Sequence, residues 1–505
     1  MRSSPLNRSH VLVFDHGTTS IRACIMDASG AIIARHQRNF EQIYPQPGWV
    51  EHNPAELWEI TLQVARAALQ EAGLGWENLA VAGLTNQRET VILWDSETGV
   101  PVYNAIVWQC RRTAPFCEAL KRQGHGPMIQ EKTGLVIDAY FSASKIRWLL
   151  QNVPQAQHLL ARNRLLFGTV DTYILWKLSG GQCHVSDVTN ASRTMLFNIH
   201  QRDWDSELLE LFEIPAAILP KVVGSCEQIG MIDPAFTNGV SVPLAGIVGD
   251  QQAALHGQKC WVPGTAKSTY GTGAFLVMNT GQTPVHSSQG LLTTLGTDAL
   301  GKPAFALEGA IFFAGAALEW LNKKLDAFDH VREIDTLAHS LASNEGVYLV
   351  PAFAGLGAPY WDSDARGAVF GITQDTGKAH LVRAALESMA YQTQAVLAAM
   401  QSEAGLTLER LRVDGGVTRS DFLMQFLADI LNVPVERTDD PELTAKGAGY
   451  LAGLAVGFWA NPQAIQSLPE PVQRFEPRMS AQERERLLTG WHQAVSRVLS
   501  KPSFE

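Results

Sequence analysis

Apolar runs and amphipathic stretches alternate along the first part of the chain. Residues 11–14 and the run that begins at Ile21 predict two strands joined by a tight loop of small polar residues. Residues 56–71 carry Leu, Ile, Val and Ala at helical spacing and predict an amphipathic helix, and residues 79–84 predict a further strand.

The second half shows the same mixture of patterns. Residues 346–350 and 411–413 predict strands, and residues 380–403 predict a long helix. A further helix is expected after Asp440, with this Asp as the cap and Pro441 in the first helical position. Strands and helices that alternate in this way predict an α/β protein.

The loop between the first two strands reads Asp15-His16-Gly17-Thr18-Thr19-Ser20. Gly17 lets the backbone approach a ligand closely, and the backbone N–H groups and hydroxyls of the loop can donate to phosphate oxygens. Asp15, at the strand end, is placed to hold Mg²⁺ directly or through water. The same residues also suit an ordinary hairpin turn, and this segment alone does not decide between the two interpretations.

A second Gly/Thr turn echoes the first. Residues 267–273 form it, and the apolar run 274–278 follows. Two such turns that face each other could clamp one polyphosphate from both sides. The echo predicts two related domains with a nucleotide in a cleft between them.

Asp250 is the candidate catalytic carboxylate. An apolar strand ends at Gly249, and a helix of small residues is expected to begin near Gln252. A carboxylate at this strand end could accept the proton of an attacking hydroxyl, which is the role of a base in phosphoryl transfer to an alcohol. Asp250 is equally compatible with a simple helix N-cap.

Composition narrows the class of protein. A chain of 505 residues suggests two or three domains, and 46% hydrophobic with 18% charged residues is typical of a soluble globular protein. The formal charge of −10 argues against a nucleic-acid partner. Any nucleotide phosphate must therefore be held by local donors and metal ions.

Cysteine usage and hydropathy bear on the compartment. The six cysteines are scattered without a Cys-x-x-Cys pair, which indicates reduced thiols in a cytoplasmic protein. The N-terminal residues lack the apolar core of a signal peptide. The longest uncharged stretch, from Gly447 towards Leu468, is broken by Asn461-Pro462, so we expect no membrane span.

Several motifs that are separated along the chain resemble those of a known family. They are residues 15–20 with Arg22, 85–90, 103–112, 168–172, 249–252, 269–273 and 413–416, together with the signature-like regions 140–152 and 367–387. With these motifs the chain resembles the FGGY carbohydrate kinases of the actin/hexokinase/Hsp70 ATPase superfamily. The Asn-Gln-Arg-Glu run at 86–89 resembles the members that phosphorylate glycerol, whereas xylulose kinases typically carry a Gly-Gln-Met-His-Gly type of sequence there.

The resemblance implies a fold and assigns different parts of the site to the two domains. The fold is α/β, with two related domains of the actin-like ATPase (ribonuclease H-like) type and a nucleotide cleft between them. Residues 1–257 would carry the glycerol pocket, the first phosphate loop and the catalytic Asp. Residues 258–505 would carry the second phosphate loop and the adenine side.

The resemblance also implies a reaction and its residues. Mg·ATP would phosphorylate glycerol to sn-glycerol 3-phosphate, the entry step of glycerol catabolism, with Asp250 as general base. The glycerol pocket would be lined by Arg88, Glu89, Tyr140, Asp250 and Gln251, with Trp108 and Phe275 over the carbon backbone. ATP would be contacted by Thr18, Thr19, Ser20, Arg22, Thr272, Gly315, Glu319, Gly416 and Ser420, and Mg²⁺ would lie close to Asp15. Relatives form dimers and tetramers, so a homo-oligomer is expected.

Three positions depart from the family pattern, and two other functions stay open. His16 stands where Gln is common, and Glu319 and Ser420 stand where Gln and Asn are expected; a carboxylate at 319 could weaken ATP binding or change ribose contacts. One alternative is another FGGY kinase that acts on a different polyol or sugar. The other is a non-catalytic nucleotide-binding regulator that kept the fold, although the presence of Asp15, Asp250 and both Gly/Thr loops disfavours it.

Overall fold

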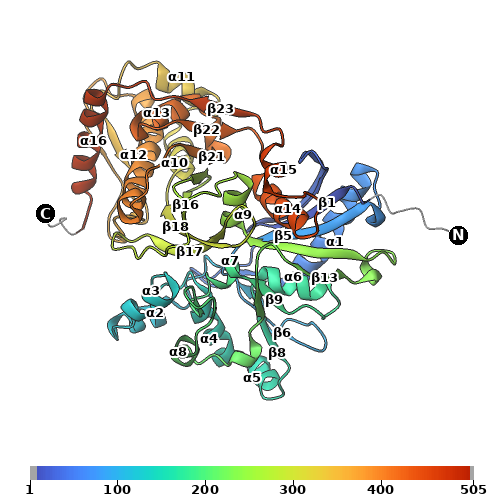
Figure 1. Cartoon of the computed structure of the whole chain (residues 1–505). Coiled ribbons are helices and arrows are strands. Elements are labelled where there is room, and N and C mark those ends of the chain that lie inside the picture. The colour runs from blue at the N-terminus through green and yellow to red at the C-terminus, as the bar shows by residue number, and fades with distance from the viewer. Residues whose placement is uncertain (1–7, 501–505) are drawn as a thin grey trace. The chain divides into compact units, whose positions relative to one another are not determined.

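The structure of the chain, a computed structural model, describes residues 8–500 (Figure 1). These residues group into two compact units. The first unit holds the chain up to Trp261 together with Thr293–Phe305 and Glu442–Pro469. The second unit holds Val262–Leu292, Ala306–Pro441 and the chain from Glu470. A single boundary between residues 257 and 258 stays a prediction, and two segments of the second half pack with the first unit.

A six-stranded mixed sheet forms the centre of the first unit. Its order is β13 (Gln228–Ile232), β14 (Val242–Gly249), β5 (Leu79–Asn86), β1 (His10–His16), β2 (Ser20–Met26) and β3 (Ile32–Asn39). β1 pairs antiparallel with β2 and parallel with β5, and β5 pairs parallel with β14. β13 and β3 close the two edges with antiparallel pairs. The strands expected at residues 11–14, from Ile21 and at 79–84 are therefore confirmed.

The second sheet has seven strands. Its order is β17 (Leu292–Thr297), β18 (Pro303–Ile311), β16 (Ala274–Gly281), β15 (Ala266–Tyr270), β21 (Leu411–Asp414), β22 (Val435–Thr438) and β23 (Val472–Phe475). β15 pairs antiparallel with β16 and parallel with β21, β21 pairs parallel with β22, and β22 pairs antiparallel with β23. This repeats the pattern of β1, β2, β5, β14 and β13. The echo between the two halves is confirmed at the level of strand order.

Helices and shorter strands complete the two units. The first unit contains α1 (Pro54–Ala72), α2 (Ala114–Arg122), α3 (Gly126–Thr133), α4 (Ser142–Asn152), α5 (Pro154–Leu160), α6 (Val170–Leu178), α7 (Val188–Ala191), α8 (Ser206–Leu211), α9 (Asp250–Gly257), α14 (Leu443–Ala455) and α15 (Pro462–Gln466). The second unit contains α10 (Gly315–Leu325), α11 (Glu333–His339), α12 (Lys378–Ala404), α13 (Asp421–Leu431) and α16 (Ala481–Ser496). Two-stranded pairs are formed by β4 (Glu51–His52) with β7 (Ala105–Ile106), β6 (Ile92–Asp95) with β8 (Leu165–Gly168), β9 (Val185–Asp187) with β12 (Lys221–Val223), β10 (Phe197–Asn198) with β11 (Asp203–Trp204), and β19 (Tyr348–Val350) with β20 (Ala368–Phe370).

The predicted helix at 56–71 is confirmed as α1, and its limits have local causes. The side chain of Asn53 accepts a hydrogen bond from the Ala55 backbone N–H at 3.0 Å and caps the first turn. Gly73, with φ of +66°, ends the helix in the left-handed conformation. The predicted long helix at 380–403 is likewise confirmed as α12.

The predicted start of the helix after Asp440 is wrong. α14 begins at Leu443, and Glu442 stands at its N-cap in place of Asp440. The Glu442 carboxylate is buried and pairs with Arg22 of β2 at 2.7 Å and with Arg35 of β3 at 2.6 Å. These ion pairs hold the chain to the sheet edge up to residue 442, so the helix begins after it.

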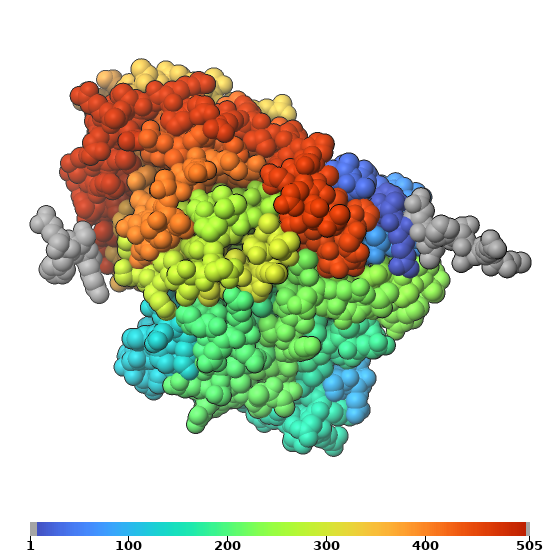
Figure 2. Space-filling view, viewed as in Figure 1, coloured from blue at the N-terminus to red at the C-terminus, as the bar shows by residue number. Residues whose placement is uncertain are grey.

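Small residues allow α14 to approach α9 and the first sheet very closely. A Cβ atom on Gly447 would lie 1.9 Å from the Ala253 carbonyl oxygen of α9. On the sheet side, a Cβ on Gly246 of β14 would lie 2.4 Å from the Ala452 backbone N. Figure 2 shows the red atoms of this C-terminal segment against the blue atoms of the N-terminal strands. Glycine at these positions is therefore required by backbone-to-backbone contact.

Between residues 8 and 500, no helix combines the length and the apolar character needed to cross a bilayer.

The close approach of α14 to α9 yields a stability prediction. Gly447→Ala forces the two helices apart, and overpacking of this kind costs about 2 kcal/mol or more. Gly126→Ala is the matched control, because Gly126 lies in the first turn of α3 and no atom lies within 4 Å of its Cβ position. Thermal unfolding should show a lower midpoint for Gly447→Ala alone. Equal midpoints for the two variants would contradict the packing argument.

Candidate active site

The carboxyl ends of three parallel strands carry the expected catalytic residues of the first unit. β1 ends at the loop after Asp15, β5 runs into Arg88 and Glu89, and β14 runs into Asp250. The register aligns Asp15 with Thr85 and Val248 with the same Thr85. Adjacent parallel strands that end together bring their following residues to one edge of the sheet, where α/β proteins bind ligands.

Asp250 is the first residue of α9, two residues earlier than the expected helix start. Gly249 is the N-cap, so the interpretation of Asp250 as an N-cap is wrong. The Gly249 N–H donates to the Thr189 hydroxyl at 2.8 Å, and that hydroxyl donates to the buried Asp187 carboxylate at 2.7 Å. The Gln251 N–H donates to Asp250 Oδ1 at 2.7 Å. The Asp250 side chain stays 32% exposed, so its position is fixed while a substrate can still reach it.

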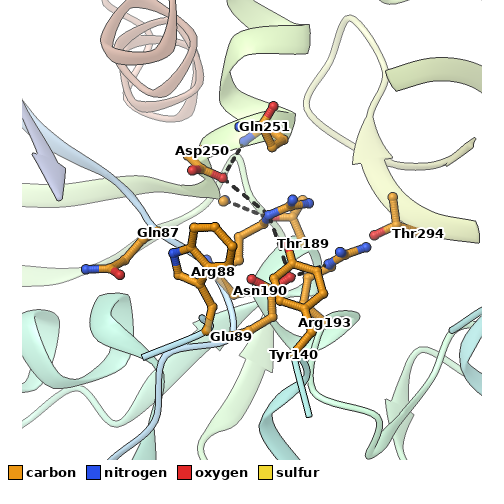
Figure 3. A network of polar contacts seen from close by, with 12 residues as sticks. Gln87, Arg88, Glu89, Tyr140, Thr189, Asn190, Arg193, Asp250, Gln251 and Thr294 are labelled. Atoms are coloured by element: carbon orange, nitrogen blue, oxygen red, sulfur yellow. Dashed lines mark hydrogen bonds and ion pairs between the residues drawn. The ribbon is translucent and has the colours of Figure 1, made fainter. Parts of the chain in front are cut away.

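Arg88 lies between two carboxylates (Figure 3). Its Nε atom is 3.3 Å from Asp250 Oδ1 and 3.9 Å from Glu89 Oε1. Its Nη1 donates to Gln252 Oε1 at 3.2 Å. Arg88 and Glu89 are both buried, which excludes the ordinary interpretation of neighbouring charges as a solvated surface pair. The two sequence neighbours thus belong to one cluster of polar side chains that also includes Asp250 and Gln252.

Aromatic rings adjoin this polar cluster. The rings of Trp108 and Tyr140 meet edge to face with centroids 5.6 Å apart, and both residues are half-buried. The Trp108 Nε1–H donates to the Thr18 hydroxyl at 3.0 Å, which connects the rings to the Gly/Thr loop. Phe275 belongs to β16 of the second unit and is half-buried there.

The site contains two buried cationic side chains for which the sequence predicts no role. Arg193 is completely buried, and its Nε lies 2.7 Å from Glu89 Oε1. Lys145 is also completely buried and donates to the backbone carbonyls of Ala139, at 3.3 Å, and Tyr140. Burial lowers the pKa of Lys145 to about 8, against the opposing effect of Glu89. Neither residue stands in a periodic pattern that predicts burial. The sequence therefore offers no signal for Arg193, and for Lys145 it offers only the signature-like region 140–152.

The Gly/Thr loop is a closed turn between β1 and β2. The Gly17 N–H donates to the Ser20 carbonyl at 3.0 Å, and Thr19 at the tip is exposed. Thr18 and Ser20 are half-buried beside it. The turn keeps hydroxyl donors accessible, as a phosphate loop requires.

Asp15 lies below this turn in a charged environment. Burial raises the pKa of Asp15 to about 6, and Arg22, 3.8 Å away, opposes that shift. Nearby Glu442 and Asp250 add to the increase. No group of three or more His, Cys, Asp or Glu side chains suited to a metal occurs within residues 8–500. A lone carboxylate suits Mg²⁺ that arrives with a nucleotide, because this ion is commonly held by one or two carboxylates plus phosphate oxygens and water.

The departure at His16 has a structural explanation. The His16 ring is buried and lies 3.3 Å from the Thr61 hydroxyl of α1. Burial lowers the pKa of His16 to about 3, so the ring is neutral at physiological pH. His16 therefore packs the sheet against α1.

A cavity of about 880 Å³ in the second unit brings the other expected nucleotide residues together. The predicted residues that line it are Thr272, Gly315, Glu319, Gly416 and Ser420. Apolar side chains, including Leu318, Phe328 and Ile334, line the same space. A Cβ on Gly416 would meet no atom within 4 Å, whereas one on Gly315 would lie 2.6 Å from the Gly271 carbonyl. A concave site with apolar walls and a few polar groups has the character of a ligand pocket.

The two departures in this cavity are both engaged by protein groups. Glu319 pairs with Lys323 one turn later at 2.5 Å. Ser420 accepts from the Leu423 N–H at 3.0 Å as the N-cap of α13 and donates to Asp335. The Ser420 hydroxyl thus stabilises the start of α13 in this structure.

Comparison with known families identifies the class of protein. Residues 10–257 match the N-terminal domain of the FGGY family of carbohydrate kinases, and residues 266–456 match its C-terminal domain. The chain belongs to the FGGY family of carbohydrate kinases. The expected two-domain α/β fold and the resemblance to this family are confirmed.

Several relatives of the chain within this family are named glycerol kinase. The chain is 54% identical to glycerol kinase 2 of Thermotoga maritima over 97% of this chain and 99% of the relative. It is 52% identical to glycerol kinase of Symbiobacterium thermophilum, with 98% and 99% covered. Among solved structures, Plasmodium falciparum glycerol kinase with ADP superposes with a TM-score of 0.93 at 35% identity, covering 97% of this chain and 98% of that one.

The raised pKa of Asp15 yields a prediction about stability and pH. A carboxyl with pKa about 6 in the folded chain and 3.8 unfolded destabilises the fold once ionised. Asp15→Asn should therefore be more stable above pH 7, by up to about 3 kcal/mol, with the gain lost as pH falls from 6 to 4. Urea unfolding across pH 4 to 8 measures this difference.

Asp95 provides a control of opposite sign. Its carboxylate accepts from Arg164 Nε at 3.0 Å, and this hydrogen bond lowers the pKa of Asp95. Asp95→Asn should be less stable than the parent at neutral pH, with the loss fading in acid. A lower stability of Asp15→Asn at pH 8 would contradict the account of Asp15.

Proposed function

We propose that this chain transfers the γ-phosphoryl group of ATP to a terminal hydroxyl of glycerol and so forms sn-glycerol 3-phosphate, the entry step of glycerol catabolism. The observation that carries the proposal is the placement of buried Arg88 between Glu89 and the accessible Asp250. The names of the relatives that cover nearly the whole chain support the same substrate.

The pocket chemistry suits a small triol. Each hydroxyl of a buried polyol needs both a donor and an acceptor. Arg88 offers N–H donors, while Glu89 and Asp250 offer acceptor oxygens within the same cluster. The neighbouring rings of Trp108 and Tyr140 can cover the carbon chain and exclude water, which is a competing phosphoryl acceptor.

Asp250 is proposed as the general base. Its carboxylate is held by the Gln251 N–H and by Arg88, and its side chain stays accessible, so it can accept the proton of the attacking hydroxyl. The bond from the Gly249 N–H to Thr189 fixes the backbone immediately before it. A base fixed in this way keeps the hydroxyl aligned for attack.

ATP binding is proposed to use groups of both units. Thr18, Thr19 and Ser20 of the closed turn would donate to phosphate oxygens, with Arg22 nearby. The cavity that Thr272, Gly315, Glu319, Gly416 and Ser420 help to line would hold the nucleoside. Mg²⁺, with Asp15 beside it, would neutralise charge on the phosphates during transfer.

Several properties of the whole protein remain proposals. A cytoplasmic location is supported by six free cysteines, all within the described residues. Gln251 and Phe275 are proposed as further substrate contacts. The homo-oligomer stays a prediction from the resemblance.

The assignment is tested by ADP release with Mg·ATP and a panel of glycerol, tetritols and pentuloses. Glycerol should be preferred, and Asp250→Asn should lose roughly 10²- to 10⁴-fold in kcat, as expected for removal of a general base. Asp375→Asn, on the exposed turn before α12, is the control and should keep full activity.

Other outcomes of the panel favour the alternatives. Reaction with another polyol but not glycerol would indicate a different FGGY kinase. A complete lack of turnover, with nucleotide still bound, would favour a regulatory protein. Full activity of Asp250→Asn would contradict its role as base.

A further inference from the structure

We propose that Arg193 is a positioning residue of the polyol pocket: it holds the Glu89 carboxylate in place and thereby leaves Arg88 to Asp250. The inference rests on the proposed function, because it concerns how the same pocket binds its polyol. Arg193 does not itself belong to the set of groups proposed to touch substrate.

The ion pair between Arg193 and Glu89 is short and buried. Arg193 Nε lies 2.7 Å from Glu89 Oε1, and both side chains are almost completely removed from solvent. In Figure 3 the Arg88 guanidinium lies above the Glu89 carboxylate and the Arg193 side chain lies to its right. Charge-assisted hydrogen bonds of this length are strong and directional.

Aromatic rings restrict the guanidinium further. The Arg193 Cζ atom lies 5.2 Å from the Phe141 ring centroid and 5.6 Å from that of Tyr140. Arginine gains electrostatic attraction from ring faces at such distances. Tyr140 is itself a proposed substrate contact, so Arg193 adjoins two walls of the pocket.

The backbone that carries Arg193 is anchored on both sides. The Arg193 N–H donates to the Asn190 carbonyl at 3.0 Å, and the Ala143 N–H of α4 donates to the Thr194 carbonyl at 2.8 Å. Ser142, the first residue of α4, donates its hydroxyl to the Glu89 carbonyl at 3.1 Å. The same helix start therefore fixes both the Arg193 segment and the Glu89 backbone.

Glu89 needs this restraint because its backbone is strained. Its φ of +61° lies in the left-handed region, which a residue with a side chain rarely adopts. Such a conformation persists only where surrounding contacts impose it. Arg193 at the carboxylate and Ser142 at the carbonyl are two such contacts.

Electrostatics explains why a second arginine matters. Without Arg193, Arg88 would be the nearest arginine for two carboxylates, 3.3 and 3.9 Å from its Nε. Lys145 also interacts with Glu89, but its ammonium donates to two backbone carbonyls. Removal of the Arg193 charge should therefore draw Arg88 towards Glu89 and away from Asp250.

The experiment replaces Arg193 by Lys, Gln and Met and measures the KM for glycerol, the KM for ATP and kcat. Gln and Met should raise the glycerol KM roughly 10- to 100-fold, the range for loss of a hydrogen bond to a charged group. The ATP KM should change less than about threefold. The fall in kcat should be a smaller factor than the rise in the glycerol KM. The reason is that the contact of Glu89 with glycerol, which Arg193 supports, would be made in both the ground state and the transition state, and such a contact acts on KM. Lys keeps the charge and should recover most of the loss.

Arg383 provides a matched control. Its Nε lies 2.7 Å from the buried Glu387 carboxylate, and its Cζ lies 5.2 Å from the Phe422 ring. This pairing of α12 with a ring of α13 resembles the ion pair and ring contact of Arg193, and it lies in the second unit. Arg383→Gln should lower thermal stability without a selective change in the glycerol KM.

A second background separates positioning from general stabilisation. In Glu89→Gln, the further change Arg193→Gln should raise the glycerol KM by less than about threefold, because the carboxylate that it holds is gone. If Arg193→Met does not fold, Arg193→Gln and Arg193→Lys decide the question. An unchanged glycerol KM in Arg193→Gln, or equal effects of Arg193→Gln and Arg383→Gln on both KM values, would overturn the inference.

Failure of the proposed function would be distinguishable from failure of this inference. The unmodified chain is assayed first with glycerol and Mg·ATP. A lack of turnover there contradicts the function, whereas normal turnover with an unaltered Arg193→Gln variant contradicts the positioning role alone.

Discussion

The buried arginine at the end of β5 is the constraint on which the site depends. A charge removed from water is costly unless it is paired and hydrogen-bonded. Arg88 meets this requirement through Glu89, which follows β5, and through Asp250 and Gln252 of α9. The need to satisfy one guanidinium therefore fixes two carboxylates, and we propose that these carboxylates recognise the hydroxyl groups of the substrate.

The first sheet supplies the geometry that this arrangement requires. β1, β5 and β14 are parallel and end at the same edge, so three functional segments emerge together there. α14 packs against these strands through glycine and alanine, and its preceding Glu442 pairs with Arg22, which lies beside Asp15. A segment from late in the sequence thus supports the edge that carries the Gly/Thr loop.

Much of this could be predicted from the sequence, because strand ends and tight turns are local signals. The Asp15 loop, the strand before Asp250 and the helix α1 follow from apolar runs and their end residues. The burial of Arg193 and Lys145 could not be predicted, because a charged residue becomes internal only through partners distant in sequence. The predicted start of α14 is wrong for the same reason: Arg22 and Arg35, more than 400 residues earlier, hold Glu442. The roles of the candidate site residues remain predictions.

We propose that Arg88, Glu89 and Asp250 together pair every hydroxyl of the substrate. The most direct test compares kcat/KM for glycerol and for propane-1,2-diol, which keeps the carbon chain and lacks one terminal hydroxyl. A pocket whose buried polar groups are left unmatched should reject the diol by roughly 10⁴-fold. A ratio of roughly 200-fold or less, the discrimination expected from an apolar pocket that senses size alone, would contradict hydrogen-bonded recognition of the hydroxyls.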